Sequence, residues 1–368
     1  MKYLGLSVLV AVGLSLAATT VYGQTYYEEE VKSSDTNRTK QVDELDKYIK
    51  SQKIDETRLS KLLVPNYSSV AAYERSVVSY RKAFAASIGY PPAGKVDQGN
   101  ARFDKIGEDA IGTYYRAHIP VLPEVESLGI YIVPKNLKGK APLVISMHGG
   151  GGTPEVALFH GGSNYHDMVR GGVKRGYVVF APTHLFFAEG YPRDIRNRID
   201  ERMRLIGTSL TAVEIYKISR ALDVLVKRPE VDPKRIGMVG LSYGGYYTLV
   251  TAALETRIKA SVSSCYYGVQ EGRYEQDENG VPSDFRFTDR FTLFKDDSIV
   301  ALICPRALEI QAGATDNASH REMGKRIAPK SSEFYGKLNV PSKFRFVVFD
   351  GGHEFHDTTA WEWLSKHL

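Results

Sequence analysis

Hydrophobic and polar positions alternate in blocks along this chain, and the blocks predict strands and helices in turn. Residues 142–147 form a continuous apolar run, as buried parallel strands require, and further strands are predicted at 177–181, 236–239, 258–265, 306–312 and 344–349. Helical patterns lie between them at 164–175, at 210–227, at 246–255, in the stretch up to about 338, and at 356–368. Strands that alternate with helices favour an α/β fold, with a mostly parallel central sheet and helices on both faces.

The pattern before residue 142 is different. Residues 111–121 and 127–133 predict two strands joined by Leu122-Pro123-Glu124, which is typical of an antiparallel hairpin. Helical patterns precede them at 42–63 and 70–88, and Pro91 and Pro92 would end the second helix. We expect these helices to cover the sheet rather than form a domain of their own. Residues 24–36 are acidic and polar and predict a leader that is disordered or loosely docked.

The first residues have the pattern of a secretory signal peptide. Lys2 precedes an apolar run over residues 3–18, and the small residues Val21 and Gly23 offer a cleavage point before Gln24. The run is shorter than the roughly 20 residues that span a membrane. We therefore expect a signal peptide at 1–23, a leader with a helical extension at 24–102, an α/β catalytic domain at 103–368, and a protein that is secreted or periplasmic without a membrane anchor.

Composition narrows the function further. The chain has 368 residues, a net charge of +5 and no basic block, so nucleic-acid binding is not indicated. Its two cysteines, Cys265 and Cys304, could be disulfide-bonded or separate thiols, and neither lies in a metal-binding spacing. His353-Glu-Phe-His356 is not the spacing that places two ligands on one helical face, and Asp277-Glu-Asn-Gly280 lacks most of a calcium loop. We expect no metal and no cofactor.

A run of glycines around one serine carries the strongest chemical signal. Gly240-Leu-Ser-Tyr-Gly-Gly245 follows a predicted strand and opens a predicted helix, the arrangement of a nucleophile elbow. The serine hydroxyl must stand clear of the backbone in a strained turn, and glycines are needed where a Cβ would collide with the neighbouring strand or helix. This predicts Ser242 as a nucleophile.

A serine nucleophile needs a base, and the base needs an acid, in the chain order serine, acid, histidine. Asp316 follows the strand at 306–312, and His353 follows the last strand in Asp350-Gly-Gly-His353. Both lie where strands reach their carboxyl edge, which is where open α/β sheets place their sites. We predict a Ser242, Asp316 and His353 triad. Three other carboxylates follow the strand at 258–265 and are alternative acids: Glu271, Glu275 and Asp277. His356, three residues after His353, is an alternative histidine.

The run His148-Gly-Gly-Gly-Gly152 follows the strand at 142–147 and predicts an oxyanion hole. Backbone N–H groups of Gly149 and Gly150, with that of Tyr243, are the expected donors. A phosphate-binding loop would need a following Lys-Ser/Thr, which is absent. Several further side chains after strands are candidates to line a substrate pocket, although aromatic side chains there could equally be core. They are His148, His184, Phe186, Tyr266 and Tyr267.

Together these motifs resemble the α/β-hydrolase superfamily, and most of all its exported members similar to dienelactone hydrolases and acetyl xylan esterases. The resemblance covers residues 103–368. It implies hydrolysis of a carboxylic ester through an acyl-enzyme, with acetyl or aryl groups on a polysaccharide as substrates. The chain departs from two related groups, because Tyr243 stands where glucuronoyl esterases carry arginine and Ser242 stands where dienelactone hydrolases carry cysteine.

Two alternatives remain open at this point. Serine peptidases similar to prolyl oligopeptidase often have the same Gly-x-Ser-Tyr-Gly-Gly elbow, but the roughly 80 residues between the predicted signal peptide and the first strand are too few for their propeller domain. A binding protein that keeps the hydrolase fold without turnover is the other alternative, and the complete triad argues against it.

Overall fold

The computed structural model describes residues 19–21, 24–27, 34–52, 56–159, 164–275 and 281–368. The chain divides into two compact units, Met1–Asp55 and Glu56–Leu368. The first contains an antiparallel pair of short strands and one helix: β1 (Thr19–Val21), β2 (Gln24–Tyr26) and α1 (Ser34–Gln52). The predicted signal peptide lies outside the described residues apart from β1, and the predicted leader contains β2 and the start of α1. Within the described ranges, no helix is long and apolar enough to cross a membrane.

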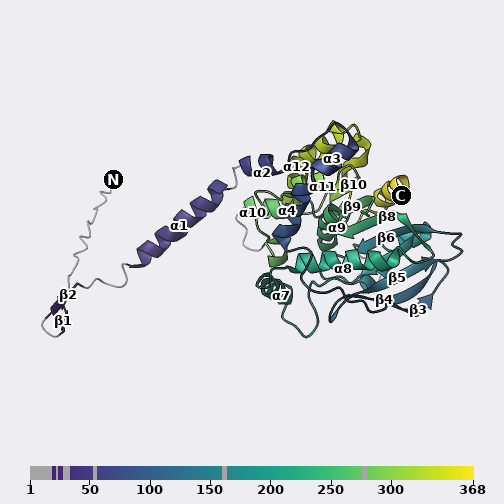
Figure 1. Ribbon diagram of the computed structural model, residues 1–368, viewed down its shortest axis with the longest axis horizontal. Helices are drawn as coiled ribbons and strands as arrows, with labels where there is room; N and C mark the ends of the chain where they lie inside the picture. Colours follow the sequence, from purple (N-terminus) through teal and green to yellow (C-terminus); the bar gives the residue numbers. More distant parts are fainter. Residues whose placement is uncertain (1–18, 22–23, 28–33, 53–55, 160–163, 276–280) are drawn as a thin grey trace, which may run out of the picture. The chain divides into compact units, whose positions relative to one another are not determined.

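The second unit is built on a nine-stranded sheet with the order β11-β10-β9-β8-β6-β7-β5-β4-β3 (Figure 1). The neighbours from β7 through β6 to β11 pair in parallel, and β3, β4 and β5 are antiparallel. The α/β class, the mostly parallel sheet and the β4–β5 hairpin are therefore confirmed, whereas β3 was not predicted. The strands are β3 (Arg102–Glu108), β4 (Gly112–Leu122), β5 (Val125–Pro134), β6 (Ala141–Met147), β7 (Val178–Pro182), β8 (Val231–Leu241), β9 (Ala260–Ser264), β10 (Ala307–Gly313) and β11 (Phe344–Phe349).

Helices cover both faces of the sheet, as the continuous apolar strands require. On β6, Leu143 and Ile145 belong to one hydrophobic core and Val144 to another, because successive side chains point to opposite faces. Helices α4 (Val78–Ile88), α8 (Leu210–Leu225), α9 (Tyr243–Leu254), α11 (Asp296–Ile303) and α12 (Ala318–Lys337) contribute to the first core. Helices α5 (Pro154–Phe159), α6 (Arg170–Lys174) and α13 (Asp357–His367) contribute to the second.

Three of the helices before the sheet belong to this unit. Besides α4 they are α2 (Thr57–Leu62) and α3 (Val70–Ser76). The helix predicted at 42–63 is divided, because residues 42–52 lie in α1 of the first unit and residues 57–62 form α2 of the second. The Tyr73 and Phe84 side chains are fully buried in the first core, and the Tyr73 hydroxyl donates to the Ala301 carbonyl at 2.9 Å. The second unit therefore includes residues 56–102, which the sequence assigned to an N-terminal extension.

The excursion between β9 and β10 is held by a buried arginine. It contains α10 (Val269–Glu275), a short 3₁₀ turn η2 (Ser283–Phe285) and α11. Arg290 is 3% exposed and pairs with Glu271 at 2.7 Å and with Asp296 at 2.6 Å. Two carboxylates around one buried guanidinium fix this segment beside the carboxyl edge of the sheet.

Candidate active site

Ser242 stands in a strained turn between β8 and α9. Its φ is 57° and its ψ is −115°, a backbone conformation that residues other than glycine rarely adopt. The flanking glycines are needed for the reason that the sequence suggested. A Cβ on Gly240 would lie 2.2 Å from the Gly244 carbonyl oxygen, and a Cβ on Gly244 would lie 2.2 Å from the Met147 oxygen.

Asp316 and His353 are brought together by the turns after β10 and β11. The His353 Nδ1 atom lies 2.8 Å from the Asp316 Oδ2 atom. These turns approach so closely that a Cβ on Gly313 would lie 2.0 Å from the Gly352 oxygen. Because Nδ1 is engaged by the carboxylate, Nε2 is the ring nitrogen left to accept a proton from a serine hydroxyl.

The alternative acids are engaged elsewhere. Glu271 pairs with Arg290, and Glu275 pairs with Arg326 at 2.6 Å. Asp277 and the predicted calcium-like stretch 277–280 lie outside the described residues. The second histidine, His356, contacts the Thr359 hydroxyl through Nδ1 at 3.0 Å. Of the candidates in the described part of the chain, Asp316 is therefore the acid that contacts His353.

A cavity of about 260 Å³ joins the nucleophile to the base. Ser242 and His353 both lie in its wall, together with Gly150 and the aromatic side chains Phe186 and Tyr266. The remaining lining residues are Arg196, Tyr243, Cys265, Val269, Gln270, Arg273, Pro282 and Phe285.

The glycine loop after β6 offers fewer oxyanion donors than the sequence suggested. The Gly149 N–H already donates to the Tyr165 hydroxyl at 2.9 Å. Gly150 faces the cavity, and the Tyr243 N–H lies at the first position of α9, where helical N–H groups have no partner within the helix. Gly150 and Tyr243 are therefore the better candidates.

His148 and His184 lie beneath the site and not in its wall. Their rings stack with centroids 3.7 Å apart, and they are 2% and 3% exposed. Burial lowers the pKa of His148 to about 4 and the pKa of His184 well below its usual value. Their predicted place in the substrate pocket is wrong; as neutral imidazoles they support the loop, since the His148 Nδ1 atom contacts the Gly149 carbonyl at 2.9 Å.

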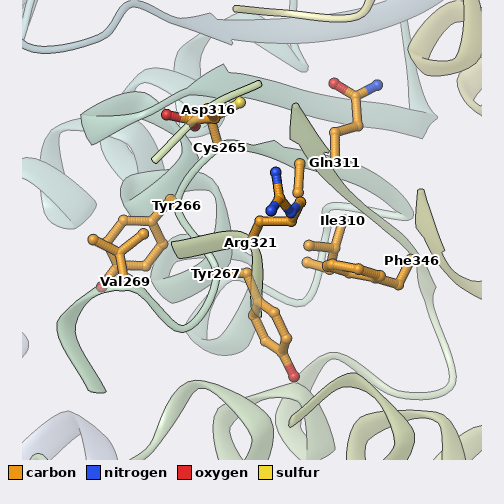
Figure 2. A pocket seen from close by; sticks show the side chains of 10 residues that line it. Cys265, Tyr266, Tyr267, Val269, Ile310, Gln311, Asp316, Arg321 and Phe346 are labelled. Atoms are coloured by element: carbon orange, nitrogen blue, oxygen red, sulfur yellow. The ribbon is translucent and has the colours of Figure 1, made fainter. Parts of the chain in front are cut away.

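The predicted aromatic residues divide between two cavities. Phe186 and Tyr266 line the cavity that contains Ser242, and Tyr266 also lines the second cavity. Tyr267 lines a much smaller neighbouring cavity, shown in Figure 2, and its hydroxyl contacts the Ser331 hydroxyl at 2.5 Å. Tyr267 is therefore not part of the wall of the cavity that contains Ser242.

Sequence reasoning missed the positive charge of the cavity. Arg196 on α7 (Ile195–Arg204) lies over the Phe186 ring at 4.0 Å and over the Tyr243 ring at 5.0 Å. Its Nε atom is 3.2 Å from the carboxylate of Asp284, which is fully buried and also accepts from the Tyr243 hydroxyl at 2.6 Å. Burial raises the pKa of Asp284, and the Arg196 charge opposes this. Among the described residues that line the cavity, there are two arginines and no carboxylate.

Cys265 is the other residue that the sequence did not connect with the site. It follows β9 with a φ of 53°, lines both cavities and is 6% exposed. Both Cys265 and Cys304 are free thiols. Burial raises the pKa of the Cys265 thiol to about 11, the Ser264 hydroxyl opposes this, and the nearby Asp316 carboxylate adds to it.

Comparisons with known proteins agree with this fold. Residues 129–298 match the dienelactone hydrolase family. YtaP of Bacillus subtilis (strain 168) is 28% identical over 238 residues, which are 61% of this chain and 76% of YtaP.

Solved structures of two esterases have the same fold. Acetyl xylan esterase 1 from Thermoanaerobacterium sp. JW/SL YS485 is 16% identical with a TM-score of 0.53, covering 85% of this chain and 98% of that one. A glucuronoyl esterase from Solibacter usitatus is 14% identical with a TM-score of 0.55, covering 81% of this chain and 94% of that one.

The fold and the family match define the class: the chain is a hydrolase with the α/β-hydrolase fold. The part that matches the dienelactone hydrolase family contains the β8–α9 turn with Ser242 and the glycine loop at 149–152.

Proposed function

We propose that this hydrolase cleaves carboxylic esters with Ser242 as nucleophile, His353 as general base and Asp316 as the acid that orients His353. The observation that carries the proposal is the 2.8 Å contact of His353 with Asp316, at a cavity whose wall also holds Ser242 in a strained turn. His353 would take the serine proton as the hydroxyl attacks, and Asp316 would stabilise the charged imidazole.

The reaction would continue through an acyl-enzyme. N–H groups of Gly150 and Tyr243 would stabilise the developing oxyanion, and the proton on His353 would pass to the leaving alcohol. Water would then attack the acyl-enzyme with His353 again acting as base. These steps use only side chains and backbone groups of this chain.

The proposed substrates are acetyl or aryl esters on a polysaccharide. Support comes from the names of similar proteins, since YtaP is named as a hydrolase and the two structural neighbours are named as acetyl xylan and glucuronoyl esterases. A carbohydrate ester also suits a cavity with aromatic and cationic walls. A panel of acetylated, feruloylated and methyl-esterified glycans would identify the preferred bond.

The test of the mechanism is a Ser242→Ala variant, assayed on acetyl esters and on aminopeptide substrates side by side. We expect ester hydrolysis in the wild type and a loss of at least about 10⁴-fold in kcat for the variant. Ser365→Ala, in the exposed part of α13, is the control and should keep the wild-type rate. Peptide cleavage in place of ester cleavage would favour the peptidase alternative, and full ester activity in Ser242→Ala would refute both.

We also propose that residues 1–23 are a signal peptide and that the mature protein is exported. The proposal depends on the sequence pattern of Lys2, the apolar run and the small residues before Gln24. N-terminal sequencing of protein recovered outside the cytoplasm should begin at or near Gln24. Protein that begins at Met1 and stays in the cell would contradict export.

A further inference from the structure

Three metal-binding donors meet at the carboxyl edge of the sheet. The Cys265 sulfur, a carboxylate oxygen of Asp316 and a ring nitrogen of His353 all lie within 4.8 Å of one another. The three residues follow β9, β10 and β11, three adjacent strands. Figure 2 shows the Asp316 carboxylate beside the Cys265 sulfur. No sequence spacing could reveal this cluster, because its members are separated by 51 and by 37 positions (316 − 265 and 353 − 316).

The separations are close to those of a tetrahedral zinc site. With Zn–S near 2.3 Å and Zn–N or Zn–O near 2.0 to 2.2 Å, tetrahedral ligand atoms lie about 3.4 to 3.6 Å apart. The widest separation in the cluster therefore needs to contract by about 1 Å. The His353 side chain can make most of this movement, because it is 42% exposed.

The chemical surroundings of the sulfur favour a cation. The carbonyl oxygens of Glu354 and Gly352 lie 3.4 Å and 3.9 Å from it, and a carboxylate oxygen of Asp316 lies within 4.8 Å. The sulfur, the carboxylate and the carbonyls are all electron-donating atoms that lie close together. Thiolate and imidazole donors bind zinc in preference to magnesium or calcium, which favour oxygen ligands.

A solvent path to the cluster exists. Cys265 and His353 line the cavity that contains Ser242, and Cys265 and Asp316 line the smaller cavity beside it. An ion that enters the substrate cavity would therefore reach both the imidazole and the cysteine.

We propose that Cys265, Asp316 and His353 form an inhibitory site for a thiophilic divalent cation, with Zn²⁺ as the typical occupant. When the hydrated ion binds, the Cys265 S–H bond breaks and its proton leaves to solvent, and the sulfur, the Asp316 carboxylate and His353 Nδ1 each replace a water on the ion. The proton that His353 Nδ1 donates to Asp316 is lost from Nδ1, and Nε2 takes one up from solvent, so Nε2 can no longer accept the serine proton. The inhibition depends on the proposed function, because it follows from removing His353 as the base for Ser242; the binding itself does not depend on it.

The experiment measures inhibition and binding separately. Each protein is assayed for ester hydrolysis over a series of Zn²⁺ concentrations, relative to its own rate in the presence of chelator. Wild type should be inhibited, and Cys265→Ser and Cys265→Ala should need at least about tenfold more Zn²⁺ for the same inhibition. Even the loss of a group that only hydrogen-bonds to a metal ligand lowers metal affinity by about that factor. Cys304→Ser, which changes the other buried thiol, should be inhibited like wild type.

Binding is followed with Co²⁺, whose bond to a thiolate gives a charge-transfer absorption that needs no catalysis. The band should appear in wild type and Cys304→Ser and should be lost in both Cys265 variants, with folding checked by circular dichroism. The proposal is overturned if wild type shows no band, if the band survives in a folded Cys265 variant, or if Zn²⁺ inhibits those variants as strongly as wild type. A protein that cleaves no ester but shows the band only with Cys265 present would refute the proposed function and retain the metal site.

Discussion

The buried His148 imidazole is satisfied only in its neutral form, and this should make the fold sensitive to acid. Its Nδ1 atom donates to the Gly149 carbonyl at 2.9 Å, and its Nε2 atom accepts from the His184 backbone N–H at 3.3 Å. A proton on Nε2 would therefore face another N–H donor. Burial lowers the pKa of His148 to about 4; the Lys217 charge acts in the same direction, and the Gly149 contact and Glu155 oppose it.

The sign and size of the effect follow from this shift. The pKa of His148 falls from 6.5 to about 4 on folding, so the unfolded chain binds the proton first as the pH falls. The part of the free energy of unfolding that depends on neutral His148 is complete above pH 6.5 and is lost as the pH falls towards 4. The shift of 2.5 units, at about 1.36 kcal/mol per unit, corresponds to about 3 kcal/mol in total, of which about 2 kcal/mol is lost by pH 5.

Guanidinium unfolding at pH 7 and pH 5 measures this loss. In the variant His148→Gln, which has a neutral polar side chain at both pH values, the drop in the free energy of unfolding between pH 7 and pH 5 should be smaller than in wild type by about 2 kcal/mol. The variant keeps His184, whose pKa is lowered first of all by its own burial. Equal drops in the two proteins would refute the reasoning.

Two further predictions concern packing around the serine turn. Gly240→Ala should lower the free energy of unfolding by about 3 kcal/mol or more, because its Cβ would lie 2.2 Å from the Gly244 carbonyl oxygen and would force α9 away from β8. Gly336→Ala is the matched control in α12, where an added Cβ meets nothing within 4 Å; chemical denaturation should show a gain of up to about 1 kcal/mol. Asp284→Ala should cost about 3 to 5 kcal/mol in the same assay, because Arg196 would be left as a buried and unpaired charge, and a cost below about 1 kcal/mol would contradict the buried ion pair.

The elements that the sequence predicted well are those with a strong apolar pattern. Strands β6, β7, β9 and β10 are almost entirely buried, and helices α8, α9 and α13 bury wide apolar stripes, so their positions could be predicted from the pattern. Helix α7 was missed because it carries few apolar residues and buries Arg196 and Asp200 instead. The helix predicted at 164–175 is real only from Arg170, since His166 has a φ of 47° and interrupts it.

The candidate site divides in the same way. Ser242, Asp316 and His353 could be placed from chain order and from the edge of the sheet at which parallel strands end. The direction of the His148 and His184 rings and the proximity of Cys265 depend on tertiary packing between distant turns. No local sequence pattern predicts such packing, so the roles of His148, His184 and Cys265 could not be predicted from the sequence.

The most direct test of the central claim is covalent labelling of the intact protein with a fluorophosphonate, followed by mass spectrometry of its peptides. An activated serine reacts with this probe, whereas an inert binding protein with the same fold does not. We expect one adduct on the peptide that contains Ser242, and strongly slowed labelling in His353→Ala. An unlabelled protein, or an adduct on a different serine, would contradict the account.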